Sequence, residues 1–150
     1  MRVIIQRVSE AIVTVNETVK SKIDKGMLIL LGIEEEDTLE DVEWLSAKIS
    51  KLRIFADVEG KMNLSLNEAS GNIIVVSQFT LHASTIKGNR PSFIKAAHPE
   101  KALQIYSAFI KQLEKDVGKP IQTGEFGTYM NVKLVNDGPV TIFIDTKNKE

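Results

Sequence analysis

Two short polar segments carry groups that could do chemistry. One is Ser77-Gln78-Phe79-Thr80-Leu81, which follows a run of β-branched residues, and the other is Asn136-Asp137-Gly138-Pro139-Val140-Thr141. Backbone N–H groups held at a strand end can stabilise negative charge on a carbonyl oxygen that water is attacking. Taken alone, however, the first segment also fits a plain strand, because polar residues at strand ends are common.

The second segment taken alone fits a hairpin turn. Asp137-Gly138 is a strong hairpin signal, and Pro139 can begin the next strand where no ladder donor is required. Chemistry at this position therefore needs support from elsewhere in the chain.

The usual catalytic motifs are missing from the sequence. It contains no G-x-S-x-G elbow, no phosphate-binding G-x-x-x-x-G-K, no dinucleotide fingerprint and no H-x-x-x-H pair. We expect His82 and His98 to be surface or capping residues, since neither has a partner nearby in sequence. Thr80 could act as a covalent nucleophile only with an adjacent base. No such base is evident, which favours a backbone role.

Composition predicts one globular domain over residues 1–150, with 43% hydrophobic and 26% charged residues. No apolar run is long enough to cross a bilayer, no signal peptide is visible, and cysteine is absent, all of which favour a cytoplasmic protein. The net charge of −1 argues against binding of long nucleic acid or DNA through a broad basic surface. Contact with RNA would have to be local. The acidic stretch from Glu34 to Glu43 predicts a solvated surface.

The hydrophobic pattern predicts many short strands and two long helices. We expect strands over Val3 to Val8, Ala11 to Val15, Thr18 to Ile23, Met27 to Leu31, Arg53 to Phe55, Asn72 to Leu81, Met130 to Val135 and Val140 to Ile144.

Helix signals occur twice. Asp37 with Glu40 resembles a capping box that opens a helix ending near Lys51, and Pro99 opens a second helix that Gly118 terminates. The fold class expected is α+β, with a mainly antiparallel or mixed, barrel-like sheet covered by the two helices.

The two polar segments together resemble the signature motifs of the D-aminoacyl-tRNA deacylases. The stretches Lys87-Gly88-Asn89-Arg90-Pro91-Ser92-Phe93 and Thr123-Gly124-Glu125-Phe126-Gly127 are also similar to that family, as is the overall length. The resemblance implies hydrolysis of the ester between a D-amino acid and the 3′ end of tRNA, with glycyl-tRNA as a further substrate. It implies no metal and no organic cofactor.

The resemblance also implies roles for individual residues. The Phe79 and Thr80 amides would stabilise the oxyanion, and Ser77 and Gln78 would shape the pocket. A ribose hydroxyl of the substrate would help to activate water. A cis Gly138–Pro139 dipeptide, inserted from the second subunit of a homodimer, would exclude L-aminoacyl groups.

Two further sets of residues are candidates for tRNA contacts. Phe126, Gly127 and Met130 could line a pocket for the terminal adenine, although a core role fits them equally well. The cations of Lys87, Arg90 and Lys95 could meet acceptor-stem phosphates. The alternative function is a non-enzymatic nucleic-acid-binding protein of the same fold.

Overall fold

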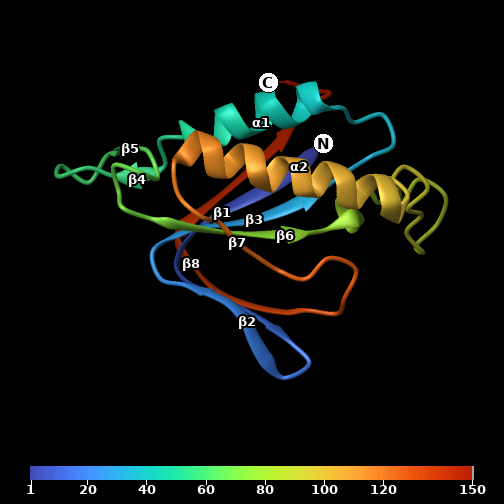
Figure 1. The fold of residues 1–150 in the computed structure, drawn as a ribbon, viewed down its shortest axis with the longest axis horizontal. Coiled ribbons are helices and arrows are strands. Elements are labelled where there is room, and N and C mark those ends of the chain that lie inside the picture. Colours follow the sequence, from blue (N-terminus) through green and yellow to red (C-terminus); the bar gives the residue numbers. More distant parts are fainter. Residues whose placement is uncertain (150) are drawn as a thin grey trace.

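The computed structural model describes residues 1–149 and shows a mixed, barrel-like sheet with both helices packed on one face (Figure 1). The main sheet has the strand order β2-β1-β3-β6-β7, and β8 pairs with β1. A separate two-stranded sheet is formed by β4 and β5. The expected α+β class with a mixed sheet and two long helices is confirmed. The elements are β1 (Arg2–Val15), β2 (Thr18–Ile23), β3 (Gly26–Gly32), α1 (Leu39–Ser50), β4 (Phe55–Ala56), β5 (Met62–Leu64), β6 (Asn72–Ser77), the 3₁₀ helix η1 (Phe79–His82), α2 (Pro99–Val117), β7 (Gln122–Thr123) and β8 (Asn131–Asp145).

The sheet curves until its two edges meet. The Ser21 hydroxyl of β2 donates to the Thr123 carbonyl of β7, and the Lys22 amide donates to the Gln122 side chain at 2.9 Å. These bonds link the first and last strands of the order and give the sheet its barrel-like form.

Strand β1 organises the sheet. It is one continuous strand rather than the two that we expected, and it pairs with β2, β3 and β8. Alternate residues such as Val3 and Ile5 are fully buried against the helices, as period-2 burial requires. The parallel pairing of β3 with β6 then places the end of β6 beside the end of β3.

The expected hairpin at Asn136 to Pro139 is wrong. Residues 131–145 form a single strand, both halves of which pair antiparallel with β1. Pairing passes from Gln6–Thr141 to Val8–Asn136, so residues 137–140 bulge out opposite one residue of β1. The long-range ladder with β1 has overridden the local turn signal of Asp-Gly.

Two strand boundaries also differ from those expected. Strand β6 ends at Ser77, and the chain then forms η1 instead of continuing to Leu81. The strand expected over Arg53 to Phe55 is Phe55–Ala56, paired with β5.

The start of α1 corrects the expected capping residue. Of the acidic stretch from Glu34 to Glu43, two carboxylates are buried, and the others are half-buried or exposed as expected. Its N-cap is Thr38, whose amide donates to Asp41 at 2.9 Å, rather than Asp37. Asp37 is 2% exposed and accepts a hydrogen bond from the Met1 amino group at 2.5 Å. Asp41 is also buried and lies 2.9 Å from the Lys147 ammonium.

Helix α2 begins at Pro99 and ends before Gly118, as expected. Gly118 adopts a left-handed conformation with φ of 71°, which glycine takes without steric cost. Among residues 1–149, no helix is both long and apolar enough to span a membrane.

Asp41 offers a test of this packing. Burial alone would raise the pKa of its carboxyl, but hydrogen bonds from Lys147, Thr146 and Thr38 outweigh that effect and lower it below its ordinary value of 3.8. A lowered pKa contributes stability above the unfolded value, and this contribution is lost as the pH falls. Asp41→Ala should lower the free energy of unfolding by about 1–2 kcal/mol at pH 7.

Urea unfolding at pH 7 and at pH 3 measures this effect, with the exposed Glu43→Ala as control. The deficit of Asp41→Ala should begin to shrink at pH 3, because the unfolded carboxyl takes up a proton below its ordinary pKa of 3.8 while the folded carboxylate stays charged. An equal deficit at both pH values would show that charge does not hold this helix start.

Candidate active site at the end of β6

The first polar segment turns sharply where β6 ends. The Gln78 amide continues the ladder by donating to the Leu31 carbonyl at 2.7 Å, and the chain then enters η1. The Leu81 amide donates to the Gln78 carbonyl at 3.2 Å, which closes the first turn. The site is therefore a strand end joined to a 3₁₀ turn.

Contacts with β1 and β3 hold η1 in place. Arg2 donates to the Leu81 carbonyl at 3.1 Å and forms an ion pair with Asp145 at 2.9 Å. A Cβ added to Gly32 would lie 3.0 Å from the Gln78 carbonyl oxygen, so glycine permits this close approach. The turn thus rests directly on the sheet.

The first amides of η1 are available as donors. Within the described part of the chain, the Phe79 and Thr80 N–H groups make no backbone hydrogen bond. The first N–H groups of any helix lack partners inside that helix. Phe79 and Thr80 are both exposed residues.

Among residues 1–149, no general base is hydrogen-bonded to the Thr80 side chain. Its hydroxyl oxygen accepts a hydrogen bond from the Gln78 side-chain amide at 2.5 Å. An amide group cannot take a proton from a hydroxyl, so this contact does not activate Thr80 as a nucleophile.

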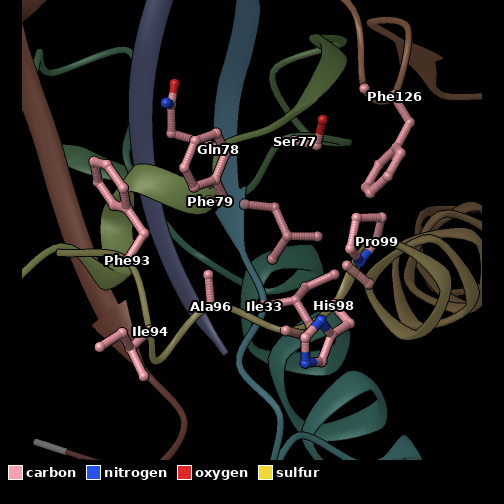
Figure 2. Close-up of a pocket in the computed structure, with 14 residues that line it drawn as sticks. Ile33, Ser77, Gln78, Phe79, Phe93, Ile94, Ala96, His98, Pro99 and Phe126 are labelled. Carbon is pink, nitrogen blue, oxygen red and sulfur yellow. The ribbon is translucent and has the colours of Figure 1, made fainter.

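A pocket of about 660 Å³ opens beside η1 (Figure 2). Its lining includes Ser77, Gln78, Phe79, Phe126 and Gly127, so five residues selected from the sequence come together there. Thr80 and Met130, which were also selected from the sequence, are not part of the lining.

Aromatic rings stand on both sides of this pocket. The Phe79 and Phe93 rings pack edge to face with centroids 5.0 Å apart, and Phe126 stands across the pocket near Pro99 (Figure 2). The ring centroids of Phe126 and Tyr106 are 5.6 Å apart. The Tyr106 hydroxyl donates a hydrogen bond to the Val75 carbonyl. Burial raises the pKa of Tyr106 to about 12, so this donor stays protonated at neutral pH. The walls are mainly apolar and suit a flat organic group.

Met130 supports the pocket from outside. Its sulfur accepts a hydrogen bond from the Glu125 amide at 3.4 Å, and a Cβ on Gly124 would lie 2.5 Å from it. Met130 therefore packs beneath the turn that carries Phe126.

The histidines occupy different environments. His82 is 1% exposed, and neither ring nitrogen has a hydrogen-bond partner among residues 1–149, so its expected surface or capping position is wrong. His98 is exposed, directly precedes α2 as its N-cap residue, and lines the pocket. A capping position for His98 is therefore confirmed, although its side chain makes no capping hydrogen bond.

Much of one wall was missed from the sequence. Residues Phe93, Ile94, Ala96, Ala97 and Pro99 line the pocket from the segment that leads into α2. An available signal was the apolar composition of this loop, because loops are normally polar at the surface.

The second polar segment lies away from the pocket of its own chain. Gly138 and Pro139 are exposed in the bulge of β8, their peptide bond is cis, and Gly138 has φ of 134°. Arg7 donates to the Asp137 carbonyl at 3.0 Å and to the Ile54 carbonyl at 2.7 Å, which ties the bulge to the barrel. Arg2, which contacts η1, lies five residues before Arg7 on β1. Five strand residues span about 17 Å, so these two anchoring arginines lie far apart along the strand.

The cations of Lys87, Arg90 and Lys95 line a second hollow of about 330 Å³. Ile94 lines both hollows, so they adjoin one another.

The fold first defines the class of protein. A solved structure described as "a probable eukaryotic D-amino acid tRNA deacylase" has a TM-score of 0.80 and 17% identity, covering 95% of this chain and 97% of that chain. The fold is therefore that of the deacylase class.

Sequence comparison then shows the family. The family model described as D-Tyr-tRNA(Tyr) deacylase matches residues 4–145. Relatives named D-aminoacyl-tRNA deacylase from Bacteroides fragilis (strain YCH46) and Flavobacterium johnsoniae are 62% and 61% identical over the whole of both chains. A solved structure named c-Myc DNA Unwinding Element Binding Protein is 42% identical, with a TM-score of 0.90, covering 97% of this chain and 98% of that chain. The chain belongs to the D-Tyr-tRNA(Tyr) deacylase family and is a hydrolase.

Proposed function

We propose that this protein hydrolyses the ester bond of D-aminoacyl-tRNA and releases free tRNA and a D-amino acid. The observation that carries the proposal is the aromatic pocket at the end of β6, with two free backbone amides on the adjoining turn. Family membership supports the same substrate class.

The pocket suggests how the substrate binds. The terminal adenosine stacks near Phe126 and Gly127, while the aminoacyl ester lies toward Ser77, Gln78 and η1. Apolar and aromatic walls suit an adenine ring, since every base offers a π-face for stacking.

The chemistry requires stabilisation of an oxyanion. Water attacks the ester carbonyl, negative charge develops on its oxygen, and the Phe79 and Thr80 amides donate hydrogen bonds to that oxygen. A neighbouring ribose hydroxyl of the substrate helps to activate the water. Preorganised amides need no ionisation, which agrees with the absence of a base beside Thr80.

A second copy of the chain completes the site. Gly138 and Pro139 do not line the pocket of their own chain, but they are exposed in a bulge tied down by Arg7. In a homodimer this dipeptide enters the partner's pocket, and its carbonyl oxygens accept hydrogen bonds from the substrate's α-ammonium group. An L side chain would collide with the dipeptide, whereas a D side chain points away and the achiral glycyl group fits.

The remaining properties follow from charge and composition. The net charge of −1 favours contact with one RNA end over binding along duplex DNA, although one similar protein is named for binding a DNA element. We propose that the enzyme works in the cytoplasm without a metal or organic cofactor.

Chiral selectivity is the first test. Purified protein incubated with D-tyrosyl-tRNA and L-tyrosyl-tRNA should release tyrosine from the D-ester at least about 100-fold faster, since a steric clash of about 3 kcal/mol corresponds to that ratio. Acid-precipitable radiolabel measures both rates. Similar rates on the two esters would refute chiral selection, and no release from either would refute the activity.

Phe79 tests the role of the backbone amide. Proline is tolerated at the first position of a helical turn, so Phe79→Pro should remove one N–H group while the turn is kept. Its kcat on D-tyrosyl-tRNA should fall about 100-fold below that of Phe79→Ala, which retains the amide. Thr80→Ala should keep most of its activity.

Two results would contradict this assignment. Equal kcat values for Phe79→Pro and Phe79→Ala would show that the amide of residue 79 does not stabilise the transition state. An inactive but folded Thr80→Ala would identify the hydroxyl as the reacting group.

Complementation tests the shared site. Gly138→Val should be inactive because a Cβ there would lie 2.9 Å from both Arg7 Nη2 and Val140 Cγ2 at a φ that L residues rarely adopt. Phe79→Pro has a damaged pocket and an intact dipeptide, whereas Gly138→Val has the reverse. In a mixed dimer, the intact pocket of one chain therefore meets the intact dipeptide of the other, and one of the two sites works. Half of the dimers in a random mixture are mixed, so about a quarter of wild-type activity should return.

Circular dichroism and isolation of the mixed dimer by two affinity tags are the controls. An isolated mixed dimer with no more activity than either parent would show that each chain builds its site alone.

A further inference from the structure

We propose that the hollow beside the main pocket binds the sugar–phosphate of the nucleotide that precedes the terminal adenosine. This inference rests on the proposed function, because it extends the same substrate from the pocket into the adjoining hollow. The hollow is lined by Ser84, Ile86, Lys87, Arg90, Ser92, Ile94 and Lys95.

The charge of this hollow is uncompensated. Within the described part of the chain, Lys87, Arg90 and Lys95 take part in no ion pair or hydrogen bond, whereas Arg2, Arg7 and Lys147 do. Three unpaired cations around one hollow favour an anionic occupant. Their guanidinium and ammonium groups match the oxygens of a phosphodiester.

The backbone of the hollow is held at its base. Ser84 and Ser92 form an antiparallel bridge, with amide-to-carbonyl distances of 2.8 and 2.9 Å. Both serines line the hollow, and a serine hydroxyl can donate to a phosphate oxygen. Between them, Gly88 has φ of 90°, so the loop tip takes a conformation that glycine adopts without cost.

The hollow also has apolar walls, which favour a nucleotide over a small inorganic anion. Ile86 is 91% exposed and Ile94 is 93% exposed, and both line the hollow. In Figure 2, Phe93 and Ile94 stand on the opposite side of the main pocket from Phe126 and Pro99. A strand of RNA whose last base lies by Phe126 would therefore pass Ile94 into the hollow.

Substrate length separates this subsite from the main pocket. D-tyrosyl-adenosine lacks the phosphate and fills the main pocket alone, whereas D-tyrosyl-tRNA reaches both. Lys87→Ala combined with Arg90→Ala should raise the KM for D-tyrosyl-tRNA about 10- to 100-fold, which corresponds to two lost phosphate contacts, and leave its kcat intact. The kcat/KM ratio on D-tyrosyl-adenosine should change less than about twofold. Lys111→Ala, an exposed lysine on α2, is the control for loss of charge alone.

Binding gives a readout without turnover. Fluorescence anisotropy with a labelled oligoribonucleotide that ends in CCA and carries no amino acid should show weaker binding by the double variant. The slope of log K against log salt should fall by about 1.4 when two phosphate contacts are lost.

Equal losses on the short and long substrates, or unchanged binding of the oligonucleotide, would overturn the subsite. Failure of the wild-type protein on both D-tyrosyl substrates would refute the proposed activity instead, and the binding measurement would still decide the subsite.

Discussion

The register of β1 is the constraint on which the rest of the structure depends. This strand pairs with β2, β3 and β8, so each of its residues determines which residues of those strands lie opposite it. Arg2 at its start holds η1, while Arg7 holds the bulge of β8. Because strand residues advance by about 3.4 Å each, the ladder along β1 separates the two polar segments by a set distance.

This separation explains how one small domain can present two different surfaces to which we assign a function. The pocket beside η1 offers aromatic walls and free amides, whereas the bulge offers only backbone and proline. Neither surface resembles a conventional triad. The chemistry that we propose uses main-chain groups whose positions come from hydrogen bonding of the fold, so no titrating side chain needs tuning.

Several local signals in the sequence predicted the structure well, and several did not. The apolar run of β3, and the proline and glycine at the two ends of α2, act on residues close by in the sequence. The sequence alone therefore predicted these elements. The Asp-Gly turn signal failed because β1 offers β8 partners on both sides of the bulge. The N-cap moved to Thr38 because Asp37 is drawn into a buried contact with Met1.

The sequence by itself determined the fold class and the two polar segments that carry the family resemblance. Long-range packing decided that Phe126 and Gly127 join the end of β6 in one pocket, that Met130 lies outside its lining, and that Ile94 lines both this pocket and a basic hollow. The difference comes from how far apart in the sequence the interacting residues lie. Strand and helix signals arise from neighbouring residues, whereas a pocket is formed by side chains that only long-range sheet pairing and helix packing bring together.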